Sequence, residues 1–494
     1  MQKSLFLPCL LCVFGIGIPA FAASDYVIVL SKEANDQTEW KKIAGTLAEK
    51  HAALAPETFV YDNDVAESAA KLKEIMPKFV CFVAKPEEAG AGYVRKIQSL
   101  TRQLDDDPYP DVRWGILTGY NAEDALKTAE ERKPLTIQKV AASFAVNLDR
   151  FKEGIHWNDS AKNEIVRKET GKPSVKSQDG PGDPTADMAK MFAGFQPDLW
   201  MTSGHATEHD WMIGFTYRAG TFIHKDGQLF GKTLDNKMLP VESPNPKIYM
   251  PVGNCLIGHI DNPDCMATAY FHSAGVRQMF GYIVPTWFGY AGWGINEYFS
   301  DQPGRFTFNE AYFANQVSLD WCIAEYQKQH KDFDPAPLLA AAAGNFPPEI
   351  KLPPEMLKNP VALTNVYMSI AQRLKADPNI AGLCYDRVNT VFYGDPAWEA
   401  RTMSGQCQWE QKLEENGQTM TLTITSDEKE PAAQPSGESS PWKNPRPIIQ
   451  WLPHRIKNPK ITEGEKWNPV VSDNFILVPR QRTVPSMRIV IQYE

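Results

Sequence analysis

The chain has 494 residues, enough for about three domains of ordinary size. With 60 acidic and 51 basic residues its formal net charge is −9, which excludes a generally basic, nucleic-acid-binding surface. At 43% hydrophobic and 22% charged residues, the composition is that of a globular protein and excludes a wholly disordered or collagen-like chain.

The first 22 residues have the pattern of a secretory signal. Lys3 gives a charged start, residues 5–18 form an apolar run, and Ala20-Phe21-Ala22 ends it with an Ala-x-Ala site. We therefore expect cleavage after Ala22 and export to the periplasm, the cell surface or the medium. An uncleaved membrane anchor is the alternative. No other segment approaches the ~20 apolar residues of a membrane helix, so we expect no span after signal cleavage.

Six of the eight cysteines remain once the signal is removed. They are Cys81, Cys255, Cys265, Cys322, Cys384 and Cys407. An even number in an exported protein is compatible with disulfides, and equally with one reactive thiol among them. Composition alone does not separate the two.

After the signal, apolar strand patterns alternate with helical patterns. The expected strands are 26–30, 58–61, 79–83 and 112–117, and the expected helices are 39–51, 66–75, 93–104 and 123–132. Alternation of this kind predicts a parallel sheet covered by helices on both faces, because each crossover needs a helix. The uninterrupted apolar strands also favour burial on both sides. We assign residues 23–154 to an N-terminal α/β subdomain.

Residues 155–185 break this pattern with Gly, Pro, Ser, Asn and Asp, and predict a loop or linker. The alternation then resumes over 186–401, the second α/β subdomain. Its expected helices are 187–195, 265–273 and 309–328, and its expected strands are 198–202, 248–252 and 276–284. From 402 to 494 helical periodicity disappears and period-2 patterns occur at 421–425 and 487–491, which predicts a small β-sandwich domain.

Two strands of the second subdomain are each followed by a side chain that can take part in proton transfer or nucleophilic attack. His205 follows the strand 198–202 and Cys255 follows the strand 248–252, each within a turn of small residues. Active sites of open α/β sheets collect at the carboxyl ends of the strands, so neighbouring strands would bring the two residues together. The imidazole can then take the thiol proton and later protonate a leaving amine. The alternative is a buried apolar cysteine and an ordinary loop histidine.

The order of these motifs resembles the gingipain-type peptidases, exported bacterial cysteine endopeptidases with a caspase fold. The resemblance rests on His205 at a strand end, on Cys255-Leu256-Ile257-Gly258 and on the helical segment 265–271. It also rests on the segments 110–117 and 391–396, and it spans roughly residues 25–400. Two positions depart from that family's pattern. Ala206 stands where Gly is usual, and Asn254 stands where a smaller residue is usual.

The resemblance implies an α/β fold, caspase/gingipain-like, with a mostly parallel sheet flanked by helices in two subdomains, and an immunoglobulin-like tail over 402–494. It implies that Cys255 attacks a peptide carbonyl, that His205 moves the protons, and that the backbone N–H groups of Ala206 and Cys255 bind the oxyanion. By the same resemblance, Trp287 or Trp293 lines the substrate pocket. The expected partner is a protein or peptide substrate. No cofactor is required, and a structural calcium ion is compatible with this prediction.

Two other functions compete with the peptidase. A catalytically silent binding or surface protein could keep the caspase-like frame, as Ala206 and the β-rich tail suggest. A zinc hydrolase is the third hypothesis, because His205-Ala206-Thr207-Glu208-His209 has the H-x-x-E-H spacing, although the flanking strand and glycines are wrong for the helix that this motif needs. We expect no metal there. His209 and His259 fit second-shell or surface roles better, and the run 105–107 fits a solvated turn better than a calcium site.

Overall fold

The computed structural model describes residues 24–357, 359–426, 446–480 and 486–494. The predicted signal segment 1–22 lies outside the described residues. Among the helices of the described ranges, none combines the length and the apolar character needed to cross a membrane.

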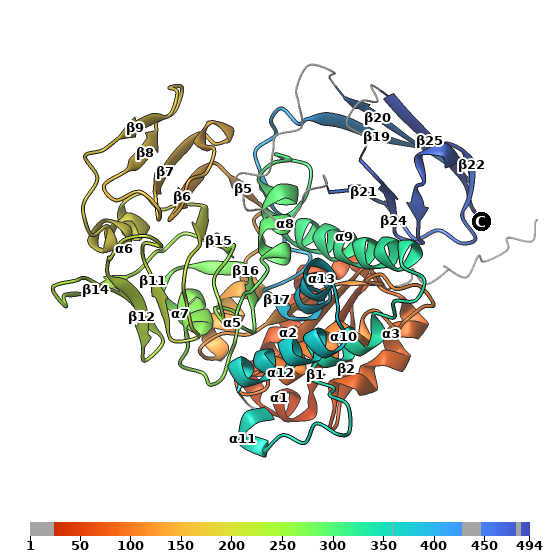
Figure 1. The fold of residues 1–494 in the computed structure, drawn as a ribbon, viewed down its shortest axis with the longest axis horizontal. Coiled ribbons are helices and arrows are strands. Elements are labelled where there is room, and N and C mark those ends of the chain that lie inside the picture. Colours follow the sequence, from red (N-terminus) through yellow and green to blue (C-terminus); the bar gives the residue numbers. More distant parts are fainter. Residues whose placement is uncertain (1–23, 358, 427–445, 481–485) are drawn as a thin grey trace, which may run out of the picture.

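One mixed sheet of twelve strands organises the α/β part of the molecule (Figure 1). In sheet order its strands are β2 (Glu57–Tyr61), β1 (Tyr26–Ser31), β3 (Phe79–Val83), β4 (Arg113–Leu117), β17 (Thr390–Tyr393), β16 (Val276–Tyr282), β15 (Lys247–Pro251), β10 (Leu199–Thr202), β6 (Lys139–Ala142), β7 (Glu153–Trp157), β8 (Ile165–Lys168) and β9 (Val175–Ser177). Most neighbours are parallel, as predicted. The antiparallel pairs are β16/β17, β7/β8 and β8/β9.

The antiparallel β16/β17 pair divides the sheet into two halves that run in opposite directions. The α/β part thus has two halves, and the strands are not distributed between them as the boundaries 23–154 and 186–401 would divide them. β6 and the first two residues of β7 come from the predicted first subdomain and lie in the second half, whereas β17 returns from the second subdomain to lie against β4. Local periodicity shows that a strand exists, but its neighbours are set by long-range pairing.

The segment 155–185 is not the linker that its composition predicts. It contains the end of β7 and all of β8 and β9, which form the edge of the large sheet. These strands are short, and those at the outermost edge are partly exposed. Turn-forming residues therefore outnumber apolar ones, which is why the composition resembles that of a loop.

Both faces of the sheet are buried beneath helices. Alternate residues of β1 enter two different cores: Val27 and Val29 pack in one, and Tyr26, Ile28 and Leu30 in the other. The helices are α1 (Lys32–Asp36), α2 (Thr38–Lys50), α3 (Ala69–Ile75), α4 (Ala91–Leu100), α5 (Ala122–Glu130), α6 (Thr185–Gly194), α7 (Met266–Ser273), α8 (Tyr290–Phe299), α9 (Phe308–Gln329), α10 (Ala336–Ala342), α11 (Pro354–Leu357), α12 (Pro360–Arg373) and α13 (Pro378–Val388).

Smaller sheets complete the molecule. A meander next to the second half contains β11 (Asp210–Met212), β12 (Thr221–Lys225), β13 (Gln228–Lys232) and β14 (Met238–Val241). β5 (Leu135–Ile137) pairs with β18 (Ala400–Thr402). The predicted C-terminal sandwich is present (Figure 1). One of its sheets is β19 (Trp409–Asn416), β20 (Thr419–Ser426), β25 (Ser486–Gln492) and β22 (Lys460–Glu463), and the other is β21 (Ile448–Trp451), β24 (Phe475–Val478) and β23 (Val470–Val471).

Candidate active site

The two strands that precede His205 and Cys255 are direct neighbours. β10 and β15 pair in parallel, with Thr202 opposite Pro251 at their carboxyl ends. The chain leaves both strands at the same edge of the sheet. It reaches His205 three residues after β10 and Cys255 four residues after β15. The structure therefore brings the two turns of the predicted dyad to one edge.

Asn254 joins the two turns. Its side-chain amide donates to the carbonyl oxygen of Gly204 at 3.1 Å, and its Oδ1 accepts from the Thr202 hydroxyl at 2.6 Å. Asn254 is fully buried, so both bonds are shielded from water. Asn254 therefore fixes the residue before His205 relative to the residue before Cys255. A smaller residue without a side-chain amide could not make this link.

The sulfur of Cys255 lies against the loop that follows β16. The Thr286 N–H donates to Sγ at 3.1 Å, and an N–H donor stabilises negative charge on its acceptor. The next residue, Leu256, has a left-handed backbone with φ of 57°, which is uncommon for a residue with a side chain. Its N–H donates to the Val284 carbonyl at 3.1 Å, which holds the turn in place. The thiol itself is partly exposed.

His205 is exposed, and its ring lies 5.2 Å from the ring of Phe215, measured between centroids. No carboxylate contacts this imidazole within the described part of the chain. The turn before it is held by the Trp211 indole, which donates to the Ser203 carbonyl at 2.8 Å. Gly204 adopts φ of 95°, a conformation that favours glycine. Aromatic packing and backbone anchoring thus orient His205 without a charged partner.

Two backbone N–H groups at this edge remain available. Ala206 lies opposite Trp211 in an isolated bridge, flanked by bonds from Met212 N–H to His205 O and from Thr207 N–H to Asp210 O. In such a pair the central N–H points away from the partner strand. Among the described hydrogen bonds, neither the Ala206 N–H nor the Cys255 N–H has an acceptor. The methyl group of Ala206 is buried, so it does not block the edge.

The two tryptophans have different environments. Trp287 is 59% exposed and directly follows Thr286, whose N–H contacts the Cys255 sulfur. Trp293 lies in α8, is partly buried and packs edge-on against Phe144 with ring centroids 5.5 Å apart. Trp287 is therefore an exposed side chain next to the Cys255 turn, whereas Trp293 packs within the fold.

All six cysteines of the described chain are free thiols. Burial raises the pKa of Cys265 to about 11 and that of Cys322 and Cys384 to about 12, and it raises that of Cys81 further. Partial burial also raises the pKa of Cys407. Nucleophilic chemistry at neutral pH is therefore disfavoured at these five positions.

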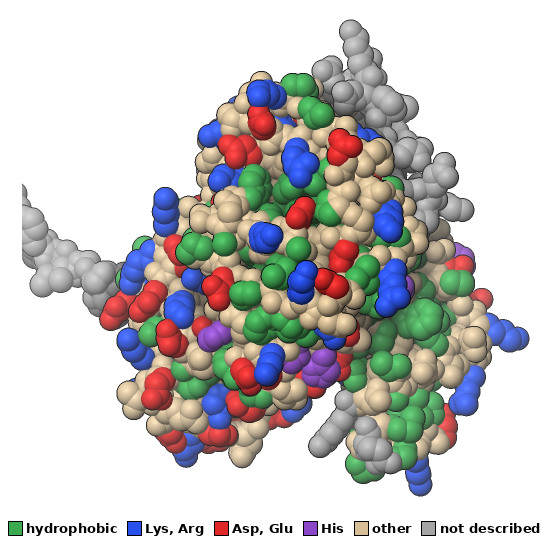
Figure 2. Space-filling model, turned by 90° about the vertical axis from the view of Figure 1, so that its left-hand side faces the viewer, with side chains coloured by type: hydrophobic (Ala, Val, Ile, Leu, Met, Phe, Trp, Pro, Cys, Tyr) green, Lys and Arg blue, Asp and Glu red, His purple; other side chains and the backbone are tan. Residues whose placement is uncertain are grey.

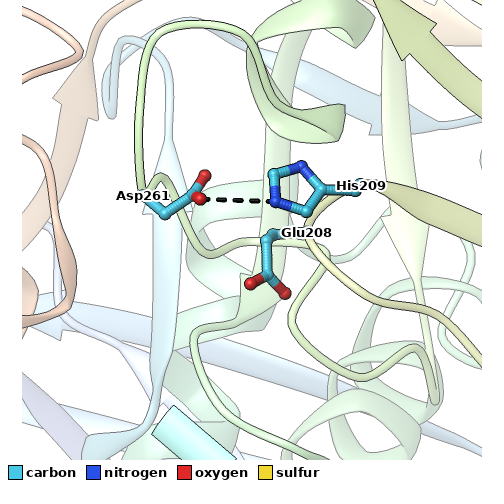
Figure 3. Close-up of side chains that lie close together, drawn as sticks. All are labelled: Glu208, His209 and Asp261. Carbon is cyan, nitrogen blue, oxygen red and sulfur yellow. Dashed lines mark ion pairs between the residues drawn. The ribbon is translucent and has the colours of Figure 1, made fainter. Parts of the chain in front are cut away.

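Glu208 and His209 do not combine with His205 as the H-x-x-E-H hypothesis requires. The segment 203–209 is an irregular turn that leads into the strand β11, so residues four apart do not share a helical face. Glu208 and His209 instead lie beside Asp261, with their potential ligand atoms within 4.8 Å of one another (Figure 3). His259 is buried, and its Nδ1 has no partner among the described residues.

A second group of carboxylates lies where the α/β part meets the C-terminal sandwich. The potential ligand atoms of Asp105, Asp107 and Asp111 lie within 4.8 Å of one another. Burial, together with the charge of Asp105, raises the pKa of Asp111 to about 8. The Ser472 hydroxyl donates to Asp107, and Asn474 donates to the Asp111 carbonyl. The run 105–107 is thus part of a clustered, partly buried group and not only a solvated turn.

The comparisons with known proteins give one similarity. No family model and no curated protein matches the chain. The complex of the pro- and mature domains of Porphyromonas gingivalis RgpB is similar at 12% identity and a TM-score of 0.35, covering 92% of this chain and 93% of that one. A similarity of this size carries no argument about activity, so the functional case depends on the geometry of the site.

The residues that position the dyad were not predicted as functional. Asn254, Phe215 and Thr286 contact the dyad or its turns, whereas Asp261 contacts His209, and all four lie in turns or loops. Asn254 alone gave a signal, as a departure from a small residue before the cysteine. The other three acquire their roles only from the way the loops meet.

Proposed function

We propose that this protein is an exported cysteine endopeptidase that uses Cys255 and His205 as a catalytic dyad. The observation that carries the proposal is the pairing of β10 with β15, together with the Asn254 bond that joins the turns bearing the two residues. Export belongs to the same proposal and rests on the sequence pattern of residues 1–22.

In the proposed reaction the Cys255 sulfur attacks the carbonyl carbon of the scissile peptide bond while His205 accepts the thiol proton. The developing oxyanion accepts hydrogen bonds from the Cys255 and Ala206 N–H groups, which lack other acceptors among the described residues. Collapse of the tetrahedral species breaks the C–N bond, and His205 returns the proton to the leaving amine. Water, deprotonated by His205, then hydrolyses the thioester and releases the acid.

Hydrolysis of a protein substrate such as casein by the wild type, Cys255→Ala and His205→Ala tests the proposal. We expect cleavage by the wild type and none above background by either variant. Cys407→Ala is the matched control, because Cys407 is also a partly exposed free thiol and should be dispensable. Equal cleavage by all four proteins, or activity lost to a chelator and untouched by iodoacetamide, would refute the dyad.

A second candidate function is a catalytically silent binding protein. It is favoured by the lack, in the described residues, of an acidic partner for His205, since most catalytic histidines are oriented by such a group. The casein experiment separates the two functions: a silent protein would show no cleavage at all, with the wild type and Cys255→Ala indistinguishable.

We further propose that Asp105, Asp107 and Asp111 hold a structural calcium ion. Clustered carboxylates repel one another unless one is protonated or a cation lies between them, and a set of oxygen ligands suits Ca²⁺. The ion would stabilise the contact of the loop after α4 with the loop before β24 in the sandwich.

A further inference from the structure

A chain of interacting side chains includes His209, which lies four residues after His205 on the same loop. Asp264 Oδ1 lies 3.0 Å from Nδ1 of His224, and Nε2 of His224 lies 3.0 Å from Nδ1 of His209. Nε2 of His209 then faces Asp261, whose Oδ2 is 3.4 Å away. The face of the molecule that includes the β11–β14 meander has histidine side chains among acidic ones (Figure 2).

The order of this chain determines which nitrogen carries a lone pair. Asp264 also accepts from the N–H groups of Asp226 and Gly227, so it acts as an acceptor and Nδ1 of His224 is the donor to it. In the neutral rings, Nε2 of His224 is then an acceptor, and Nδ1 of His209 must donate to it. Nε2 of His209 is left with a lone pair, directed at the side of the ring where Asp261 lies.

In this tautomer the lone pair of His209 Nε2 faces the Asp261 carboxylate (Figure 3). A potential ligand atom of Glu208 lies within 4.8 Å of both. The buried Nδ1 of His259 lies nearby without a partner in the described chain, and the carboxylates that act on His259 most are those of Glu208 and Asp261. A cation bound between Glu208, His209 and Asp261 would accept the lone pairs of their ligand atoms.

We propose that Glu208, His209 and Asp261 bind a divalent transition-metal ion, for which Zn²⁺ is the best match. Bonds of about 2.0–2.2 Å place tetrahedral zinc ligands about 3.4 Å apart, which is the separation of His209 Nε2 and Asp261 Oδ2. An imidazole among the ligands selects against Ca²⁺ and Mg²⁺. The remaining ring nitrogen of His209 is held by the His224–Asp264 pair, as outer partners hold zinc-ligating histidines elsewhere.

The site connects the two loops of the dyad. Glu208 and His209 follow His205 on the loop after β10, and Asp261 follows Cys255 on the loop after β15. The half-exposed His209 side chain leaves a path for an ion from solvent. A bound ion therefore links the two loops from outside the dyad, and this inference does not depend on peptidase activity.

Isothermal titration of the chelator-treated mature chain with Zn²⁺ tests the site, in the absence of any substrate. We expect one bound ion in the wild type and in Cys255→Ala, and lost binding in His209→Gln and Asp261→Asn. Asp264→Asn, which alters only the outer partner, should weaken binding about 10- to 100-fold. His330→Gln and Glu242→Gln are exposed control substitutions away from the cluster. Circular dichroism checks that each variant is folded.

The alternatives give different results. Loss of binding in Cys255→Ala with retention in His209→Gln would place the ion on the dyad and overturn the proposal. Full displacement of Zn²⁺ by an equal concentration of Ca²⁺, or no binding to the wild type, would overturn it as well. Co²⁺ loaded into the site should give the visible absorption of a tetrahedral nitrogen–oxygen site, and this signal should disappear in His209→Gln.

Discussion

Two histidines four residues apart on one loop have opposite environments. The His205 ring has no charged partner in the described structure and packs against Phe215, whereas the His209 ring lies in a chain of two carboxylates and a second imidazole. An imidazole whose Nδ1 is fixed by such a chain keeps the lone pair of Nε2 in a set direction, so it suits a ligand role. A ring held by an aromatic side chain alone keeps both nitrogens available for proton transfer. Under our two proposals, the loop therefore carries His205 for proton transfer and His209 for metal binding.

The largest effect on activity should come from removing the His205 ring, which has no charged partner in the described structure. His205→Ala should lower kcat/KM by about 10²–10⁴, the usual contribution of a general acid–base group. His330→Gln, which alters an exposed histidine on the C-terminal side of α9, should leave kcat/KM unchanged. A decrease in kcat/KM of less than fivefold in His205→Ala would show that His205 is not the general acid–base group.

Asn254→Ala should lower both stability and activity, because it breaks the link between the two turns. Leaving buried polar groups unpaired costs about 1–3 kcal/mol, which urea denaturation would measure. The same variant should reduce kcat more than it changes KM. Asn254→Asp keeps the acceptor for Thr202 and loses the donor to Gly204, so it isolates the link itself. An unchanged kcat in both variants would show that the turns need no such connection.

Phe215→Ala should have a smaller effect on the orientation of His205. Aromatic pairs contribute about 0.5–1.5 kcal/mol, which corresponds to a loss of about two- to tenfold in kcat/KM. Phe215 is exposed, so the free energy of unfolding should change little. Phe215→Tyr retains the ring and should retain the activity. If the Ala and Tyr variants behave alike, the stacked ring does not position His205.

The acidic group at the sandwich contact should show a pH-dependent stability that calcium removes. The pKa of Asp111 is raised from 3.8 to about 8, so the native state binds more protons than the unfolded state between these values. Without calcium, the free energy of unfolding should therefore fall as the pH rises from about 4 to 8. Ca²⁺ should restore it, as a shift of a few degrees in the melting temperature.

Asp111→Asn should abolish both the pH-dependent loss and the calcium effect, whereas Asp106→Asn, in the same run but outside the group, should keep both. Calcium stabilisation that persists in Asp111→Asn would place the ion elsewhere.

The sequence allowed prediction of the elements that local patterns determine. The strands that became β1, β3, β10 and β15, the long helix α9 and the C-terminal sandwich all follow from apolar periodicity. The return of β17 to the first half of the sheet and the edge strands β8 and β9 did not, because pairing partners are not encoded locally. The candidate site shows the same contrast between local and long-range features. His205 and Cys255 were predicted because each follows the end of a strand, whereas the contacts of Asn254, Phe215 and Asp261 depend on how separate loops meet.

The most direct test of the dyad is the rate at which each thiol reacts with iodoacetamide at mildly acidic pH, mapped by mass spectrometry. Cys255 combines partial exposure with an N–H donor on its sulfur, whereas burial raises the pKa of the other five thiols. We expect Cys255 to be alkylated first, and we expect His205→Ala to slow the alkylation of Cys255 and of no other thiol. Equal, slow labelling of Cys255 and Cys407, unaffected by His205→Ala, would contradict the proposed dyad.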